Sequence, residues 1–179
     1  MSDVTFQNNV PDPLLSGREL PSFKFELEKS NGKVVGNSFG KEATVEQLPI
    51  SKGIAGVSMQ LAPGAMRELH WHPNADEWQY IIEGDLIVTM FGSHGRFRTE
   101  QLHAGDVGYI PQGYGHSIEN VRGKPTRMLI GFNTGIYQAI DLSAWIAGNP
   151  VDVLATNFGR SASLLEKFPR KDVFISPNQ

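Results

Sequence analysis

The sequence predicts an all-β barrel that carries a polar N-terminal arm and a short helical tail. Three observations support this prediction. Glycine and proline are frequent, at 19 and 11 of 179 residues, and turn signals recur about every ten residues. Between these signals apolar and polar residues alternate, as in strands with one buried face. From residue 141 onward, helix start and stop signals replace the alternation.

The chain divides into three parts. Residues 1–20 are polar and contain proline, so they form an arm rather than a core segment. Residues 21–140 form the barrel. Residues 141–179 form a helical tail that packs on the barrel, with Asp141 as the N-cap of its first helix and Pro150 beyond the end of that helix.

The expected elements follow one another between turn residues. Asn31–Lys33 is a hairpin signal, and Gly84-Asp85 lies near the tip of a hairpin over 77–92. Further strands are expected at 23–28, 34–40, 67–72, 116–121 and 126–132. One more is expected within 53–66, before a Pro-Gly turn, and two within 96–113, on either side of Ala104-Gly105. Three short helices are expected at 141–150, 151–159 and 161–168.

Composition narrows the class of protein. Hydrophobic residues make up 40% and charged residues 20%, and the net charge of −3 does not favour binding to nucleic acid or to an anionic membrane. The absence of cysteine excludes disulfides, zinc-thiolate sites and thiol nucleophiles. No apolar run is long enough to span a bilayer, and no secretory signal begins the chain, so we expect a cytoplasmic protein.

The stretch ELHWHPNADEWQY, residues 68–80, contains a candidate metal site. His70 and His72 are two residues apart, so in a strand they point to the same face. Glu77 follows a short turn and opens the next strand, and a hairpin would return it beside the histidines. Two imidazoles and a carboxylate on one face are metal ligands. His116 follows a Pro-Gly turn at the start of another strand, and it is the natural fourth ligand.

These stretches resemble the paired motifs of the cupins. The residues that match in type and spacing are Gly64, His70, His72, Glu77 and Gly84 in the first motif, and Gly105, Pro111, Gly113, His116 and Asn120 in the second. The resemblance implies a double-stranded β-helix, or jelly roll, with a metal held inside by His70, His72, Glu77 and His116. Gly84 and Gly105 stand where tight turns need a positive φ.

A finer resemblance is to one half of the oxalate decarboxylases, which are usually two fused cupin domains. It is carried by PGAMRELHWHPN, AGDVGYIPQGYGH and LSAWIAGNPVDVLATNFG. It implies a single-domain cupin that binds manganese and a small carboxylate, with dioxygen as a possible cofactor, and that assembles as a homo-oligomer. Arg67 matches the arginine that binds substrate, although it has the opposite strand parity to His70 and reaches the site only if the strand bulges.

One departure from this family concerns the proton donor. The family uses a glutamate either in a lid before the tail or on the last strand, but the segment 131–140 contains no carboxylate and Ile130 occupies the strand position. Tyr137 lies in the lid segment as a possible catalytic group, and Thr134 and Gly135 give that segment flexibility. The catalytic acid is therefore unknown, and Asp141, the nearest acid, is expected to cap a helix.

Two main hypotheses about function remain open. The first is a metalloenzyme that acts on oxalate or a related small carboxylic acid, with either decarboxylase or oxidase chemistry. The second is a metal-containing binding or storage module that does not turn oxalate over. Manganese is the expected ion, while Fe²⁺, Co²⁺, Ni²⁺ and Zn²⁺ also suit three imidazoles and one carboxylate. A DNA-binding regulator is not favoured, because no basic patch or helix-turn-helix accompanies the barrel.

Overall fold

The computed structural model describes residues 21–121 and 123–177, so the expected arm at 1–20 lies outside the described residues. The strands are β1 (Lys33–Val35), β2 (Ser38–Ala43), β3 (Ala55–Leu61), β4 (Met66–Trp71), β5 (Glu77–Glu83), β6 (Asp85–Phe91), β7 (Phe97–His103), β8 (Val107–Ile110), β9 (Gly115–Glu119), β10 (Thr126–Phe132), β11 (Ile140–Asp141) and β12 (Ile175–Ser176). The helices are the 3₁₀ turn η1 (Leu27–Lys29), α1 (Leu142–Gly148), α2 (Val151–Phe158) and α3 (Ala162–Leu165).

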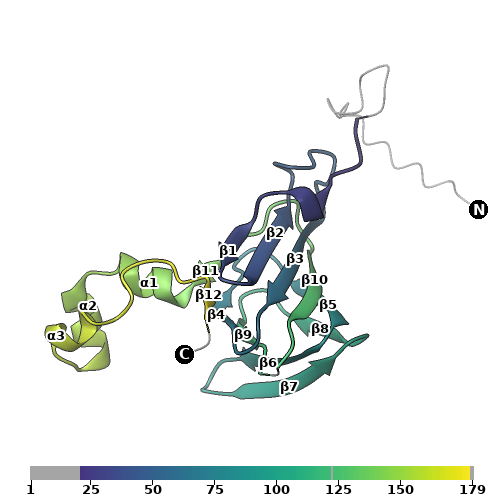
Figure 1. The fold of residues 1–179 in the computed structure, drawn as a ribbon. Coiled ribbons are helices and arrows are strands. Elements are labelled where there is room, and N and C mark those ends of the chain that lie inside the picture. The colour runs from purple at the N-terminus through teal and green to yellow at the C-terminus, as the bar shows by residue number, and fades with distance from the viewer. Residues whose placement is uncertain (1–20, 122, 178–179) are drawn as a thin grey trace, which may run out of the picture.

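Two antiparallel sheets face each other and form the barrel (Figure 1). One sheet has the strand order β1-β2-β3-β10-β5-β8, and the other has the order β11-β4-β9-β6-β7 with β12 also paired to β4. The inward faces share one apolar core, built from residues of both sheets and of the segments between strands: Ala55, Val57, Met59, Leu61, Ala65, Ala75, Ile81, Leu86, Val88, Ile110, Ile118, Met128, Ile130, Phe132 and Ile175. The predicted all-β barrel is therefore confirmed.

Consecutive strands often lie in opposite sheets, which corrects the hairpin expected over 77–92. β5 pairs with β10 and β8, whereas β6 pairs with β9 and β7. The turn at Gly84 therefore carries the chain across the barrel, and Ala104-Gly105 does the same between β7 and β8. Local turn signals cannot distinguish a crossing of this kind from a hairpin, because both need a tight turn with a positive φ.

The first elements also differ from expectation. Residues 23–28 do not form a strand, because the chain turns into η1, where the Lys29 amide donates to the Glu26 carbonyl at 3.0 Å. The Glu28 carboxylate accepts hydrogen bonds from Ser58 and from Arg127, both at 2.7 Å. A tertiary contact thus outweighs the local strand pattern.

The first hairpin turns at Gly36-Asn37 and not at Asn31–Lys33. Val35 pairs with Ser38, which leaves two residues in the loop, and Gly36 has a φ of 56°. Two-residue hairpin loops favour residues that accept a positive φ, and Gly36 provides one where the strands need it.

The helical tail contains the three expected helices, but α1 is the helix that lies against the barrel, whereas the whole tail was expected to pack on it. α1 contacts β4 and β11, while α2 packs against α3 and both lie away from the barrel in Figure 1. Leu154 and Leu165 are the buried residues of α2 and α3. Within the described ranges no helix has the length and hydropathy needed to cross a membrane.

The crossing at Gly84 gives a stability prediction. Gly84 has a φ of 81°, and a β-carbon there would lie 2.6 Å from Thr126 Cγ2 and 3.2 Å from the Pro125 carbonyl oxygen. Gly84→Ala should lower the free energy of unfolding by about 2 kcal/mol or more, because a left-handed backbone and a steric clash add together. Urea unfolding measures the loss.

Gly36→Ala is the matched control, since Gly36 has a φ of 56° and no atom lies within 4 Å of the position that a β-carbon would take there. It should lose only about 1 kcal/mol, the cost of the backbone conformation alone. Equal losses in the two variants would show that the clash at Gly84 is relieved without cost.

Candidate metal centre

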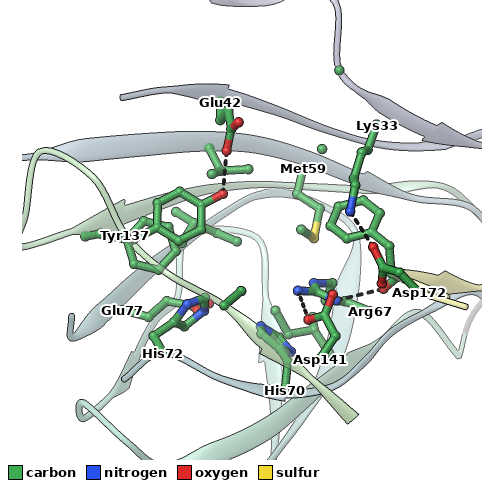
Figure 2. Close-up of a pocket in the computed structure, with 18 of the residues that line it drawn as sticks. Lys33, Glu42, Met59, Arg67, His70, His72, Glu77, Tyr137, Asp141 and Asp172 are labelled. Atoms are coloured by element: carbon green, nitrogen blue, oxygen red, sulfur yellow. Dashed lines mark hydrogen bonds and ion pairs between the residues drawn. The ribbon is translucent and has the colours of Figure 1, made fainter. Parts of the chain in front are cut away.

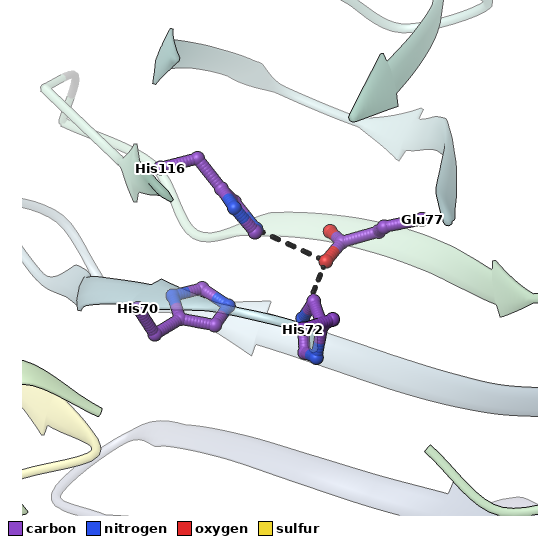
Figure 3. Close-up of side chains that lie close together, drawn as sticks. All are labelled: His70, His72, Glu77 and His116. Atoms are coloured by element: carbon purple, nitrogen blue, oxygen red, sulfur yellow. Dashed lines mark hydrogen bonds and ion pairs between the residues drawn. The ribbon is translucent and has the colours of Figure 1, made fainter. Parts of the chain in front are cut away.

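Four buried side chains converge inside the barrel (Figure 3). His70 lies on β4 and His72 directly follows it, Glu77 opens β5, and His116 lies on β9. Each offers one ligand atom, and these atoms all lie within 4.8 Å of one another. Glu77 reaches the histidines from the opposite sheet, across the barrel, and not through the hairpin that the sequence suggested. The predicted set thus forms a possible metal site.

The three imidazoles are oriented by backbone carbonyl groups. The Nδ1 atom lies 2.7 Å from the Glu68 oxygen in His70, 2.7 Å from the Gln138 oxygen in His72 and 3.2 Å from the Tyr114 oxygen in His116. A carbonyl oxygen only accepts, so these partners assign the ring hydrogen to Nδ1. In the neutral form of each ring, Nε2 then carries a lone pair directed toward the centre, as in histidines that bind a metal.

The centre is arranged to receive a cation. Glu77 Oε2 lies 2.9 Å from Nε2 of His72 and 3.0 Å from Nε2 of His116. The Nε2 atom of His72 is buried without a hydrogen-bond partner. If the rings are neutral, the Nε2 atoms and the Glu77 oxygen are all acceptors, and none of them can donate a hydrogen bond to another. A metal ion between them would accept all of these lone pairs. The residues present therefore fit a divalent metal.

Protonation states in the site agree with this picture. Burial, followed by the nearby charge of Arg67, holds the pKa of His70 well below its ordinary value. Burial opposes ionisation of Glu77, yet in the metal-free site protons on the facing rings of His116 and His72 would outweigh it and hold the pKa of Glu77 well below its ordinary value, a stabilisation that a bound cation would supply in their place. A neutral imidazole and an ionised carboxylate are the forms that bind metals.

A cavity of about 570 Å³ opens beside these ligands. Its lining includes His70, His72 and Glu77 together with apolar residues of the core. Figure 2 shows Glu42 and Tyr137 on one side of the cavity, and Lys33, Arg67, Asp141 and Asp172 on the other.

Arg67 reaches the cavity because β4 is irregular. The register of β4 against β9 shifts between Arg67 and His70, so the expected parity does not hold. As a result Arg67, Glu68 and His70 are all buried. The bulge that the sequence required for Arg67 is therefore present.

Asp141 does not cap α1 as expected. It occupies the N-cap position, but its side chain makes no capping hydrogen bond and instead accepts one from Arg67 Nη2 at 2.6 Å. Glu68 takes over the capping, because its carboxylate accepts from the Ser143 amide at 2.9 Å and from the Ser143 hydroxyl at 2.8 Å. Burial raises the pKa of Asp141, an effect that Arg67 opposes.

The segment expected to form a lid is bound to its surroundings. The Tyr137 hydroxyl donates to Glu42 at 2.8 Å, and its ring stacks on Phe132 with centroids 4.0 Å apart. A β-carbon on Gly135 would lie 2.5 Å from the Lys52 carbonyl oxygen, so this glycine is required for close packing. The Thr134 hydroxyl donates to the Ile136 carbonyl at 3.3 Å, and Thr134 does not line the cavity.

Sequence reasoning missed several polar residues of the cavity. Lys33 and Asp172 form an ion pair at 2.6 Å, and Glu42 accepts from Tyr137. Lys33 opens β1, Glu42 lies on β2 and Asp172 precedes β12, all far from the two motifs in the sequence. No local signal marks them, since only the closing of the barrel and the return of β12 to β4 bring them together.

Comparison with known proteins agrees with the fold and with the site. The sequence matches the cupin family over residues 27–164, and the chain belongs to that family. A solved structure of oxalate decarboxylase from Bacillus subtilis, described for its Mn(II) centres, superposes with a TM-score of 0.84 at 34% identity and covers 93% of this chain and 45% of that one. The barrel is thus the cupin jelly roll.

Among curated relatives, the oxalate decarboxylase of Bacillus subtilis is 35% identical over 163 residues, which are 89% of this chain and 42% of that enzyme. A probable germin-like protein of Arabidopsis thaliana is 31% identical over 119 residues, 65% of this chain and 56% of that protein. The chain therefore spans less than half the length of the bacterial enzyme.

Metal content tests the ligand assignment. His116→Ala removes an Nε2 atom and leaves three ligands, so the purified protein should retain less than about a tenth of the metal per chain, measured by inductively coupled plasma mass spectrometry after reloading and desalting. His103→Ala is the control, because His103 is exposed and pairs with Asp85 at 2.7 Å outside the site. Full occupancy in His116→Ala would remove this residue from the metal shell.

Proposed function

We propose that this cupin is a metal-dependent enzyme that acts on oxalate or a related small carboxylic acid. The observation that carries the proposal is the convergence of three imidazoles, each oriented through Nδ1, with Glu77 beside a cavity that Arg67 lines. The similarity to oxalate decarboxylases supports the substrate class. His70, His72, Glu77 and His116 would hold the ion.

We take manganese as the ion, because the related Bacillus enzyme has Mn(II) centres. Fe²⁺, Co²⁺, Ni²⁺ and Zn²⁺ suit the same donor atoms and are alternatives. When bound, the ion supplies a Lewis acid for a carboxylate oxygen and, if redox-active, a site for dioxygen. The chain supplies Arg67 to orient the anion.

Oxidase chemistry is favoured over decarboxylation, because oxidation does not require a group that delivers a proton to carbon. Decarboxylation of oxalate to formate and carbon dioxide adds one proton to carbon, which needs a donor beside the substrate. The segment 131–140 has no carboxylate, and burial raises the pKa of Tyr137 far above its ordinary value. The cavity acids Glu42 and Asp141 are engaged by Tyr137 and by Arg67. Oxidation by dioxygen, which gives two carbon dioxide and one hydrogen peroxide from oxalate and two protons, needs no proton on carbon.

The alternative is a binding or storage module that holds a small carboxylate without turnover. One observation favours it, namely that the cavity carboxylates outside the metal shell all have partners. Glu42 accepts from Tyr137, Asp141 pairs with Arg67, and Asp172 pairs with Lys33. The fold alone does not decide between a binding protein and an enzyme.

Product analysis tests the enzyme proposal. Manganese-loaded protein is incubated with ¹³C-labelled oxalate in air at mildly acidic pH, with carbon-13 NMR for formate and a peroxide assay run in parallel. We expect peroxide without formate, and His72→Ala should abolish it. Formate as the main product would contradict the oxidase assignment, and the absence of both products with metal bound would support the binding module.

We also propose that the protein assembles as a homo-oligomer, a dimer or larger, and that it is cytoplasmic. Support for assembly comes from the outer face of the β10-β5-β8 sheet, where Trp78 is paired with Tyr109, and Tyr80 with Val107 and Leu129. All five side chains are exposed, and contiguous apolar surface of this kind commonly marks an interface.

Light scattering tests the assembly. At micromolar concentration we expect at least twice the chain mass of 19.7 kDa. Trp78→Glu should reduce that mass by placing a charge on the proposed interface. Phe97→Glu is the control, since Phe97 is an exposed aromatic residue on the other sheet. A monomeric wild-type chain would contradict the proposal.

A further inference from the structure

Arg67 is held on several sides. Its Nη2 atom donates to Asp141 at 2.6 Å and its Nη1 atom donates to the Phe174 carbonyl at 2.9 Å. Its guanidinium carbon also lies 4.5 Å from the centroid of the Phe174 ring. The side chains of Arg67 and Asp141 are almost fully buried, at 5% and 9% exposure. The guanidinium is therefore fixed in place, and an ion pair already compensates its charge before any ligand enters (Figure 2).

The other cation of the cavity lining is also compensated. Lys33 pairs with Asp172 at 2.6 Å. Apart from neutral histidines, the charged lining residues are Lys33 and Arg67 against Glu42, Glu77, Asp141 and Asp172. The lining has a formal charge of −2, which is two cations against four carboxylates, and a divalent metal would bring it to zero. The ion with Glu77 would carry one positive charge, and the rest of the lining has a formal charge of −1, so the lining offers no second positive charge to a ligand with two negative charges.

A third carboxylate, that of Glu68, lies close to the carboxylates of the two ion pairs. Glu68, Asp141 and Asp172 offer oxygen atoms that lie within 4.8 Å of one another. The cluster of these three with Lys33 and Arg67 has a formal charge of −1, or zero when the carboxylates share one proton. In neither form does the cluster present a net positive charge to a ligand.

The position of Asp141 is set by the fold and not by helix capping. Glu68 caps α1, so the Asp141 carboxylate is available to Arg67. A helix N-cap position accepts serine, threonine or asparagine equally well, so a carboxylate is not required there for the helix. The carboxylate of Asp141 instead compensates the positive charge of Arg67 in the cavity.

We infer that Asp141 is a specificity-determining residue, which neutralises Arg67 so that the cavity favours carboxylic acids with one negative charge over dianions. The inference rests on the proposed function, because it concerns which small carboxylate that site accepts. Oxalate would be accepted best as its singly charged form, and its fully ionised form would be disfavoured because Arg67, paired with Asp141, offers no uncompensated charge to the second carboxylate.

Oxalate and oxamate provide the test, because they have nearly the same shape but carry two charges and one at neutral pH. Their dissociation constants are measured by titration calorimetry, without oxygen, on the manganese-loaded full chain, and the metal content is checked afterwards. Comparison of the ratio of the two constants between variants cancels the difference in the intrinsic affinity of the two anions for the metal. Asp141→Asn should shift this ratio toward oxalate by about tenfold or more, because a buried negative charge is removed.

Three further variants make the result specific. Asp141→Ser, which keeps a good N-cap residue, should give the same shift and replaces Asp141→Asn if that variant folds poorly. Asp152→Asn removes an exposed charge from α2 and should leave the ratio unchanged. The double variant Arg67→Gln/Asp141→Asn should lose the gain for oxalate, because the guanidinium that Asp141 neutralised is gone.

An unchanged ratio in Asp141→Asn and Asp141→Ser, with both anions still bound, would overturn this inference and leave the proposed function intact. A gain that persists in the double variant would also overturn it, since the effect would not act through Arg67. If neither anion binds to any variant while the metal is retained, the proposed function fails, and the inference fails with it.

Discussion

The irregular step in β4 between Arg67 and His70 is the constraint on which much of the structure depends. A regular strand would place only every second of these side chains inside the barrel. The register shift instead buries Arg67, Glu68 and His70 together. Glu68 then reaches the first turn of α1, its carbonyl orients His70, and Arg67 enters the cavity. One local irregularity therefore couples the start of the tail, a metal ligand and the charge of the cavity.

Strand geometry fixes His70 and His72 locally, so they could be predicted from the sequence, whereas Glu77 and His116 come from other strands and were predicted through the resemblance to the cupin motifs. His70 and His72 alternate correctly even beside the bulge, and His116 lies opposite His70 in the β4–β9 pairing. Gly84 and Gly105 both have the positive φ that their turns required. The alternation of His70 with His72 and the conformation of the two glycines depend on a few neighbouring residues, so the sequence pattern carries them.

The partners of the ligands could not be predicted, because they depend on contacts between distant segments. Asp141 was expected to cap a helix, a reasonable inference from local signals, but Arg67 competes for its carboxylate from 74 residues away. Glu68 takes over the capping, bonding to Ser143, which lies 75 residues away in the sequence. The segment 23–28 fails as a strand for a similar reason, since Glu28 bonds to distant side chains on β3 and β10. The crossing of β5 to β6 between sheets likewise depends on pairing that a turn residue does not specify.

The hydrogen bond between His72 Nδ1 and the Gln138 carbonyl joins the metal centre to the segment 133–139. Asn74 fastens the same segment, accepting from the Gln138 amide at 2.8 Å and donating to the Ile136 carbonyl at 3.0 Å. A coordinated imidazole is a stronger donor through Nδ1, so metal binding strengthens this attachment. Ordering of the segment and affinity for the ion are then reciprocal in the sense of thermodynamic linkage. The rate of amide hydrogen exchange in 133–139 thus becomes an internal report on whether the ion is bound.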